Sequence, residues 1–405
     1  MTQLSVKPNQ ILLKNSHFKD DLLSVRYLFP NEEPSITTVN LLSYLMTDRT
    51  IHYPTKKAMN VRMDELYGLS IQTKTSSIGF THVLEIRVKA LNQRYKKEMD
   101  WNQIESFVLE CILHPLMNEE TFNEACVNMT SALERAEDNP SLLGFRIAAE
   151  AVSNSEPLKW FSQGSREVLS KLKMSDVERF HASMIQQKPM IFLGTDRERS
   201  LSHLISSLGS IEKNYTTAYT FPTCIPQHRI VKKAIPQSTL THLYVTHIGY
   251  NDPDYLALRI MTIVLGQLPS SLLFSEIREK RSLCYSIHAT TLNFDGVMLI
   301  QTGIDSLKQS LVSQLIEIQI DRLKSGKFST QLVDMAKKMM ISSMETIEDD
   351  RSSYFSFMHQ RMLNHRDYLI PPLIKQIKSI EKKDVIRVAH QLSLISTSLI
   401  EGEQR

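Results

Sequence analysis

Two side chains seven residues apart carry the chemistry that this sequence suggests. Arg278 and Tyr285 lie in the segment 270–287, SSLLFSEIREKRSLCYSI, where a short helix over 270–281 is expected to lead into a strand. A guanidinium binds carbonyl or carboxylate oxygens, and a phenol can donate a hydrogen bond to a developing oxyanion. Together they could bind a peptide carbonyl. The residues alone favour a simpler interpretation, with Arg278 on a solvated helix surface and Tyr285 in a strand with its hydroxyl at the rim.

Length and composition favour an ordinary globular protein of two or three domains. The chain has 405 residues, of which 22% are charged and 42% hydrophobic, and its net charge is only +3. No basic stripe with interleaved aromatic residues is present, so we expect no nucleic-acid partner. No apolar run reaches the ~20 residues of a membrane span, and the first ten residues lack a signal-peptide core. Four widely spaced cysteines fit a reducing compartment. We therefore expect a cytoplasmic protein without a membrane partner.

The order of predicted elements repeats once along the chain. Strands at 22–29, 70–75 and 83–90 precede helices at 101–113, 119–137 and 142–152; strands at 240–248, 285–292 and 297–303 precede helices at 309–323 and 330–346. The stretch 213–228 has two prolines and no helical period, and predicts a linker between domains 1–212 and 229–405. Two unrelated domains are the alternative. Strand hairpins followed by helices predict an α+β fold, with two homologous domains that are each a mainly antiparallel sheet with helices on one face.

The sequence resembles the insulinase/pitrilysin superfamily of zinc peptidases, the inverzincins. The second half carries QSTLTHLYVTHIGYNDPDYLALRIMTIVLG followed by SSLLFSEIREKRSLCYSI, which is similar to the second-domain signature of that family. The segments LLSYLMTDRTIHYPTKKAMNVRMDELYGLSI and HPLMNEETFNEACVNMTSAL resemble its first-domain zinc region. The resemblance is to the small two-domain type that works in pairs, such as mitochondrial processing peptidase and its bacterial relatives. It covers nearly the whole chain.

The sequence departs from this family where zinc should bind. Active members carry His-x-x-Glu-His, in which the two histidines bind zinc and the glutamate is the general base. The corresponding positions here are Asn40, Ser43 and Tyr44, none of which is a strong zinc ligand or base. The last ligand is expected about seven residues beyond Glu124, near Ser131, where no ligand is found. We therefore expect no metal site and no cofactor in this chain.

The resemblance implies a role for Arg278 and Tyr285 in another subunit's active site. In paired relatives this motif of one subunit faces the zinc of the other, so Tyr285 would bind the oxyanion and Arg278 the substrate backbone. The resemblance also implies that a peptide would pair with a sheet edge as an added strand, and residues 70–76 fall where that edge would run. An ordinary exposed edge strand has the same composition.

Three hypotheses follow for the function. The first is a non-catalytic, zinc-less subunit of a heterodimeric zinc metallopeptidase, in which a homologous partner holds the zinc and the two cleave a peptide substrate. The second is a catalytically silent homodimer that binds peptides, and the third is a purely structural homodimer. The retained Arg278 and Tyr285 favour the first. No peptidase activity is expected from the chain alone.

Overall fold

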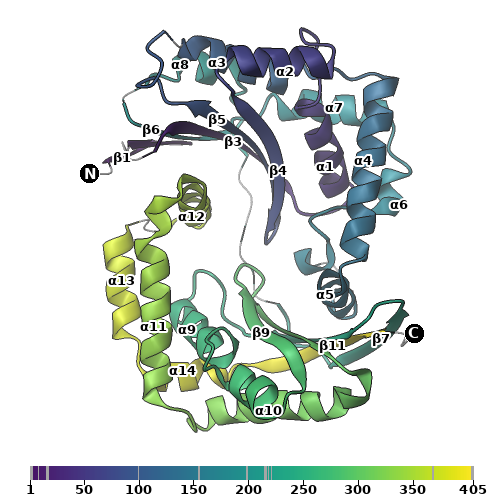
Figure 1. Cartoon of the computed structure of the whole chain (residues 1–405), viewed down its shortest axis with the longest axis vertical. Helices are drawn as coiled ribbons and strands as arrows, with labels where there is room; N and C mark the ends of the chain where they lie inside the picture. The colour runs from purple at the N-terminus through teal and green to yellow at the C-terminus, as the bar shows by residue number, and fades with distance from the viewer. Residues whose placement is uncertain are drawn as a thin grey trace. The chain divides into compact units, whose positions relative to one another are not determined.

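The structure is a computed structural model that describes residues 3–402, except 8, 15–17, 99, 154–155, 198, 214–216, 218, 220 and 367–368. The chain divides into two compact units (Figure 1). Unit 1 comprises Met1–Glu134 and Trp160–Thr216, and unit 2 comprises Arg135–Lys159 and Thr217–Arg405. The predicted linker 213–228 includes five residues that lie outside the described part of the chain, so the domain boundaries predicted from the sequence stay predictions.

Unit 1 contains a six-stranded sheet in the order β1-β2-β6-β3-β5-β4. All neighbouring strands are antiparallel except β2 and β6, which are parallel. The long central strands β3 and β5 pair over their whole length, and β4 forms one edge. The strands are β1 (Gln3–Lys7), β2 (Gln10–Lys14), β3 (Asp20–Pro30), β4 (Ser70–Ile78), β5 (Thr81–Leu91) and β6 (Met190–Thr195).

The helices of unit 1 form a core with this sheet. Helix α1 is mostly buried, its polar side chains included, and it lies beside β4 and β3. Leu42 of α1, Leu84 of β5 and Ile104 of α3 belong to one buried hydrophobic cluster. The helices are α1 (Ser35–Met46), α2 (Lys56–Glu65), α3 (Trp101–Leu113), α4 (Glu119–Glu137), α6 (Arg166–Leu169), α7 (Met174–Met184) and α8 (Ser202–Ser207).

Unit 2 repeats this plan with a five-stranded sheet in the order β7-β11-β8-β10-β9. Again one pair is parallel, β7 with β11, and the other pairs are antiparallel. The strands are β7 (Gln227–Lys233), β8 (Ser238–Val245), β9 (Cys284–Leu292), β10 (Val297–Ile304) and β11 (Ser393–Gly402). The helical elements are α5 (Pro140–Glu150), η1 (Pro157–Lys159), α9 (Tyr255–Gly266), the π-helix η2 (Phe274–Glu279), η3 (Ser306–Lys308), α10 (Gln309–Lys324), α11 (Thr330–Glu345), η4 (Ile347–Asp349), α12 (Arg351–Leu363), α13 (Ile370–Ser379) and α14 (Lys382–Ala389).

The two units share one order of elements. The series β3, α1, α2, β4, β5, α3, α4 of unit 1 corresponds to β8, α9, η2, β9, β10, α10, α11 of unit 2. In each unit the first of these strands also pairs with a strand from the end of the unit, β6 or β11. The predicted α+β fold of two homologous, mainly antiparallel domains is confirmed.

Helix α5 belongs by its contacts to unit 2, although it lies between the two segments of unit 1 in the chain. It packs on β8 and β11, on the face opposite α9, α10 and α14 (Figure 1). Gly144 allows close approach, because a Cβ there would lie 2.7 Å from Oγ1 of Thr241. Unit 2 therefore has its main helix layer on one face and α5 on the other.

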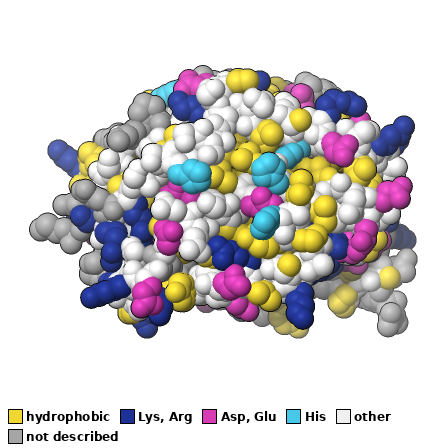
Figure 2. Space-filling view, turned by 90° about the horizontal axis from the view of Figure 1, so that it is seen from above, with side chains coloured by type: hydrophobic (Ala, Val, Ile, Leu, Met, Phe, Trp, Pro, Cys, Tyr) yellow, Lys and Arg dark blue, Asp and Glu magenta, His cyan; other side chains and the backbone are white. Residues whose placement is uncertain are grey.

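The described surface carries charges of both signs. On the face that Figure 2 shows, Lys and Arg side chains are interspersed with Asp and Glu, and apolar side chains lie between them. No described helix is long and apolar enough to cross a membrane.

Candidate functional site

The corner that carries Arg278 and Tyr285 is built by a helix end of defined geometry. The N–H of Leu283 donates to the carbonyl of Ile277, and the N–H of Ser282 to that of Arg278, both at 3.0 Å. These bonds span six and four residues, one more than the bonds of a Schellman motif, and Ser282 has the left-handed conformation at φ 51°. The predicted helix is thus a π-helix over its last turn. These bonds fix the direction in which the chain enters β9, and so the position of Tyr285 relative to Arg278.

Arg278 has no acidic partner among the described residues. Its guanidinium lies over the ring of Phe274, 4.5 Å from the centroid. The neighbouring cations Lys280 and Arg281 both pair with Glu276, at 3.1 Å. The other two cations therefore share one carboxylate, and Arg278 is held by a ring that accepts no strong hydrogen bond. Its N–H donors are available to a ligand.

Tyr285 is displayed by a bulge in the sheet. Ile287 pairs with Thr302 and Cys284 with Ile304, so β9 has one residue more than β10 between these pairs. Such an extra residue re-aims side chains and interrupts the alternation of the strand. Tyr285 is consequently 82% exposed, and no described residue hydrogen-bonds its hydroxyl.

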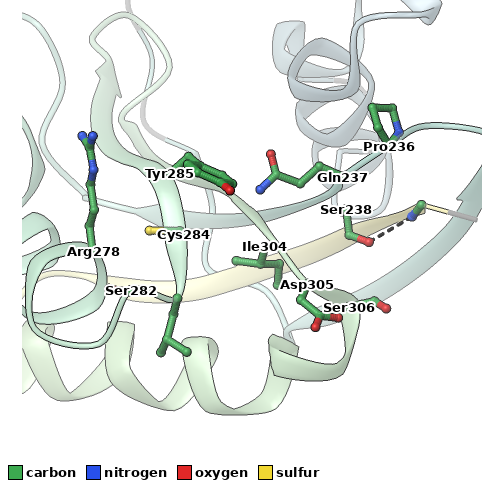
Figure 3. A pocket seen from close by; sticks show the side chains of 12 residues that line it. Pro236, Gln237, Ser238, Arg278, Ser282, Cys284, Tyr285, Ile304, Asp305 and Ser306 are labelled. Atoms are coloured by element: carbon green, nitrogen blue, oxygen red, sulfur yellow. Dashed lines mark hydrogen bonds between the residues drawn. The ribbon is translucent and has the colours of Figure 1, made fainter. Parts of the chain in front are cut away.

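The corner borders an open cavity of about 830 Å³ within unit 2 (Figure 3). Tyr285 lies between Arg278 and Gln237 at this cavity. Its other polar lining includes Ser238, Cys284, Asp305 and Ser306. Burial raises the pKa of the Cys284 thiol, while a hydrogen bond with Thr302 and the charge of Arg278 act in the opposite direction. The cavity is large enough for a few residues of a peptide.

The predicted zinc-motif positions, Asn40, Ser43 and Tyr44, lie on α1, and the first two take part in a hydrogen-bond network within unit 1. Asn40 donates from Nδ2 to the carbonyls of Ile36 (2.8 Å) and Ser162 (2.9 Å), and accepts at Oδ1 from Thr75 (2.6 Å). The Ser43 hydroxyl donates to the carbonyl of Asn40 at 2.7 Å. Tyr44 is half-buried and packs against the unit 1 core. The hydrogen bonds of Asn40 and Ser43 hold α1 in place and leave these two side chains little capacity for a ligand.

The expected region of the last zinc ligand is also occupied by other interactions. Glu124 on α4 pairs with Lys56 at 2.7 Å and Arg49 at 2.9 Å, and these pairs, chiefly the one with Lys56, hold its pKa below the usual value. Ser131 lies one to two turns further along the same helix and is half-buried. Among the described residues, no group of three or more His, Cys, Asp or Glu could hold a metal ion.

The stretch 70–76 lies on an edge strand, as predicted. It belongs to β4, whose one ladder partner is β5. Thr73 donates from its hydroxyl to the carbonyl of Ser43 at 2.8 Å, and Thr75 binds Asn40. The polar face of α1 therefore supports this edge strand. Whether a peptide pairs with the edge stays a prediction.

Comparisons with known proteins agree with this architecture. Residues 171–340 match the family described as "Peptidase M16 inactive domain". A Bacillus subtilis protein described as "Probable inactive metalloprotease YmfF" is 22% identical over 411 residues, 97% of this chain and 95% of that protein. Two solved structures share the fold. A conserved protein from Enterococcus faecalis V583 has a TM-score of 0.91 at 24% identity, over 100% of this chain and 99% of that one. A protease from Helicobacter pylori has a TM-score of 0.81 at 15% identity, over 99% of each chain.

The fold and the two sites define a protein of the metallopeptidase-like class, with two homologous domains. In sequence the chain is similar to the M16 peptidase family, whose inactive-domain model matches residues 171–340. Asn40, Ser43 and Tyr44, which the resemblance predicts to stand in place of the His-x-x-Glu-His motif, lie on α1.

Sequence reasoning identified Arg278 and Tyr285 but missed the groups that present them. Phe274 precedes Arg278 by four residues, a spacing that could have indicated a cation–π pair on a helix. The bulge in β9 and the side chain of Gln237 had no such signal, because both depend on how β9, β10 and β8 pair.

Proposed function

We propose that this chain is the non-catalytic subunit of a heterodimeric zinc metallopeptidase, to whose active site it supplies Arg278 and Tyr285. The observation that carries the proposal is the availability of these two side chains. Tyr285 is 82% exposed without a described hydrogen-bond partner, and Arg278 pairs with no described carboxylate although its neighbours Lys280 and Arg281 share one. Polar groups that a fold leaves unpaired at a cavity suit an external ligand.

The two side chains have distinct roles in this proposal. Attack on a peptide carbonyl turns its oxygen into an oxyanion, and the Tyr285 hydroxyl donates a hydrogen bond to that oxygen as the charge develops. Arg278 donates to a carbonyl of the substrate main chain and holds the peptide in position. The zinc and the general base come from the partner, because the α1 positions of this chain carry neither.

The test is reconstitution with a homologous chain from the same organism that carries His-x-x-Glu-His. A quenched-fluorescence peptide library should be cleaved by the mixture far faster than by either chain. Tyr285→Phe should lower kcat by roughly 10²–10³-fold, the usual cost of one oxyanion donor, without changing assembly. Arg278→Ala should lower kcat/KM roughly tenfold or more, mainly through KM, because it removes a charged hydrogen bond.

Matched controls separate these roles from general effects. Tyr95→Phe removes another exposed phenol, and Arg281→Ala removes another cation of the same charge run. Both should leave kcat and KM nearly unchanged, since exposed ion pairs contribute little. Equal kcat for wild type and Tyr285→Phe in an active mixture would overturn the proposal, and would leave peptide binding or assembly as the function.

A further inference from the structure

Gln237 is a third polar side chain at the cavity beside Arg278 and Tyr285. It directly precedes β8, in which Ser238 pairs with Ile304 and Thr239 with Gly303. It is exposed, and its carboxamide makes no hydrogen bond with any described residue. Figure 3 shows it on the opposite side of Tyr285 from Arg278. All three groups line the same cavity, with Tyr285 between the other two in this view.

The position of Gln237 depends on the absence of a side chain at Gly303. A Cβ at Gly303 would lie 2.7 Å from Oε1 and 2.8 Å from Cδ of Gln237, well inside contact distance. Gly303 is also the β10 residue that lies between the two pairs flanking the bulge, the same bulge that exposes Tyr285. One local arrangement of β8, β9 and β10 thus displays both the phenol and the carboxamide.

The carboxamide of Gln237, which no described residue hydrogen-bonds, matches the hydrogen-bonding chemistry of a peptide group. Its NH₂ can donate to a main-chain carbonyl and its oxygen can accept from a main-chain N–H. We propose that Gln237 binds the main chain of the substrate peptide on the far side of Tyr285 from Arg278, so that the peptide spans the cavity between the two. This inference rests on the proposed function and adds a substrate-binding residue to it. The ligand class is an extended peptide, bound through its backbone with little dependence on sequence.

The sharpest test is Gly303→Ala, measured in the reconstituted pair. The added methyl meets the far end of a flexible side chain, so Gln237 can swing away while the fold persists. The variant should raise KM roughly three- to tenfold, the range for one neutral hydrogen bond, with kcat within about twofold. Gln237→Ala should raise KM by the same factor. The double variant should raise it no further, because both changes remove one contact.

Several outcomes decide between this inference and its alternatives. An unchanged KM for Gln237→Ala, or KM factors that multiply in the double variant, would overturn the role of Gln237. Gln331→Ala, an exposed glutamine on α11, is the control and should have no effect. Urea unfolding should show Gly303→Ala to be as stable as wild type, and a large loss of stability would invalidate that variant and leave Gln237→Ala as the test. If Tyr285→Phe lowers kcat while Gln237→Ala has no effect, the proposed function stands and only this inference fails.

Discussion

The polar face of α1 and the corner between η2 and β9 differ in what their side chains bind. On α1, Asn40 makes three hydrogen bonds to its own chain, and Ser43 takes part in two more. At the corner, Arg278 has no described acidic partner and Tyr285 no described hydrogen bond. One region has its polar groups satisfied internally, and the other presents them to solvent.

This difference indicates how the two regions contribute. A buried polar group that is fully bonded stabilises the fold, and its loss costs the desolvation of whatever it leaves unpaired. An exposed polar group without a partner contributes little to stability, so any function it has must involve another molecule. Substitutions on the polar face of α1 should therefore change the free energy of unfolding, and substitutions at the corner should change ligand binding and kinetic constants.

The largest expected effect on stability comes from Asn40→Leu. The change keeps the branched shape and the number of heavy atoms but removes three hydrogen bonds, and leaves the Thr75 hydroxyl and the Ser162 carbonyl without those partners. It should lower the free energy of unfolding by about 3–4 kcal/mol. Both tryptophans, Trp101 and Trp160, lie in unit 1, so urea unfolding followed by tryptophan fluorescence reports on it.

Tyr285→Phe provides the contrast in the same assay. Its hydroxyl is solvated, so the free energy of unfolding should stay within about 0.5 kcal/mol of wild type. If Asn40→Leu were neutral, or Tyr285→Phe strongly destabilising, the division between a structural and a ligand-binding region would not hold.

Sequence patterns predicted the strands and helices well, because these elements show clear alternation or helical periodicity of apolar residues. The alternation of Leu84, Ile86 and Val88 with charged residues marked β5, and the helical periods of α3 and α4 gave their observed bounds. The assignment of α5 to unit 2 could not follow from such patterns. Its small residues Gly144, Ala148 and Ala149 indicate a close-packed face, but periodicity does not say which sheet that face contacts.

Those parts of the candidate site that depend on residue type alone could be predicted from the sequence. Arg278 and Tyr285 were identified through the family motif, and the loss of zinc ligands through Asn40, Ser43 and Tyr44. The sequence could not predict that the Arg278 guanidinium is available to a ligand, because this depends on Glu276 pairing with Lys280 and Arg281 and not with Arg278. The bulge likewise needs the register of two strands, which a single strand's sequence does not contain.

A smaller effect concerns the pH dependence of unit 1. His82 of β5 is fully buried and its Nδ1 lies 3.1 Å from the hydroxyl of Ser77 on β4. Burial lowers its pKa from 6.5 to about 4. His82 is therefore protonated below about pH 6.5 in the unfolded chain, but only below about pH 4 in the folded chain. Stability should be unaffected above pH 6.5 and fall by about 2–3 kcal/mol as the pH drops from 6.5 to 4.

His82→Phe tests this assignment, because the ring is kept and the titration removed. The variant should show a flatter loss of stability between pH 6.5 and pH 4 in urea unfolding followed by tryptophan fluorescence. A pH profile as steep as that of wild type would assign the acid sensitivity to another group. Asn40→Leu should lower the whole curve without changing its slope, since Asn40 does not titrate.

The smallest effect compares the equivalent helix ends of the two units. Gly68 follows α2 at φ 73°, with Leu69 donating back to Met63, and Ser282 follows η2 at φ 51°, with Leu283 donating back to Ile277. A left-handed conformation is strained for serine and not for glycine, so Ser282→Gly should stabilise unit 2 by about 1 kcal/mol. Gly68→Ser should destabilise unit 1 by a similar amount, and only through backbone strain, because a Cβ there meets no atom within 4 Å.

Tryptophan fluorescence measures the effect of Gly68→Ser on unit 1, and hydrogen exchange of the β9 amides measures the effect of Ser282→Gly on unit 2. Equal signs for the two substitutions would mean that the corners are not equivalent. If Ser282→Gly stabilises unit 2 yet lowers kcat of the reconstituted pair, the serine is retained because it limits the motion of Tyr285 relative to Arg278.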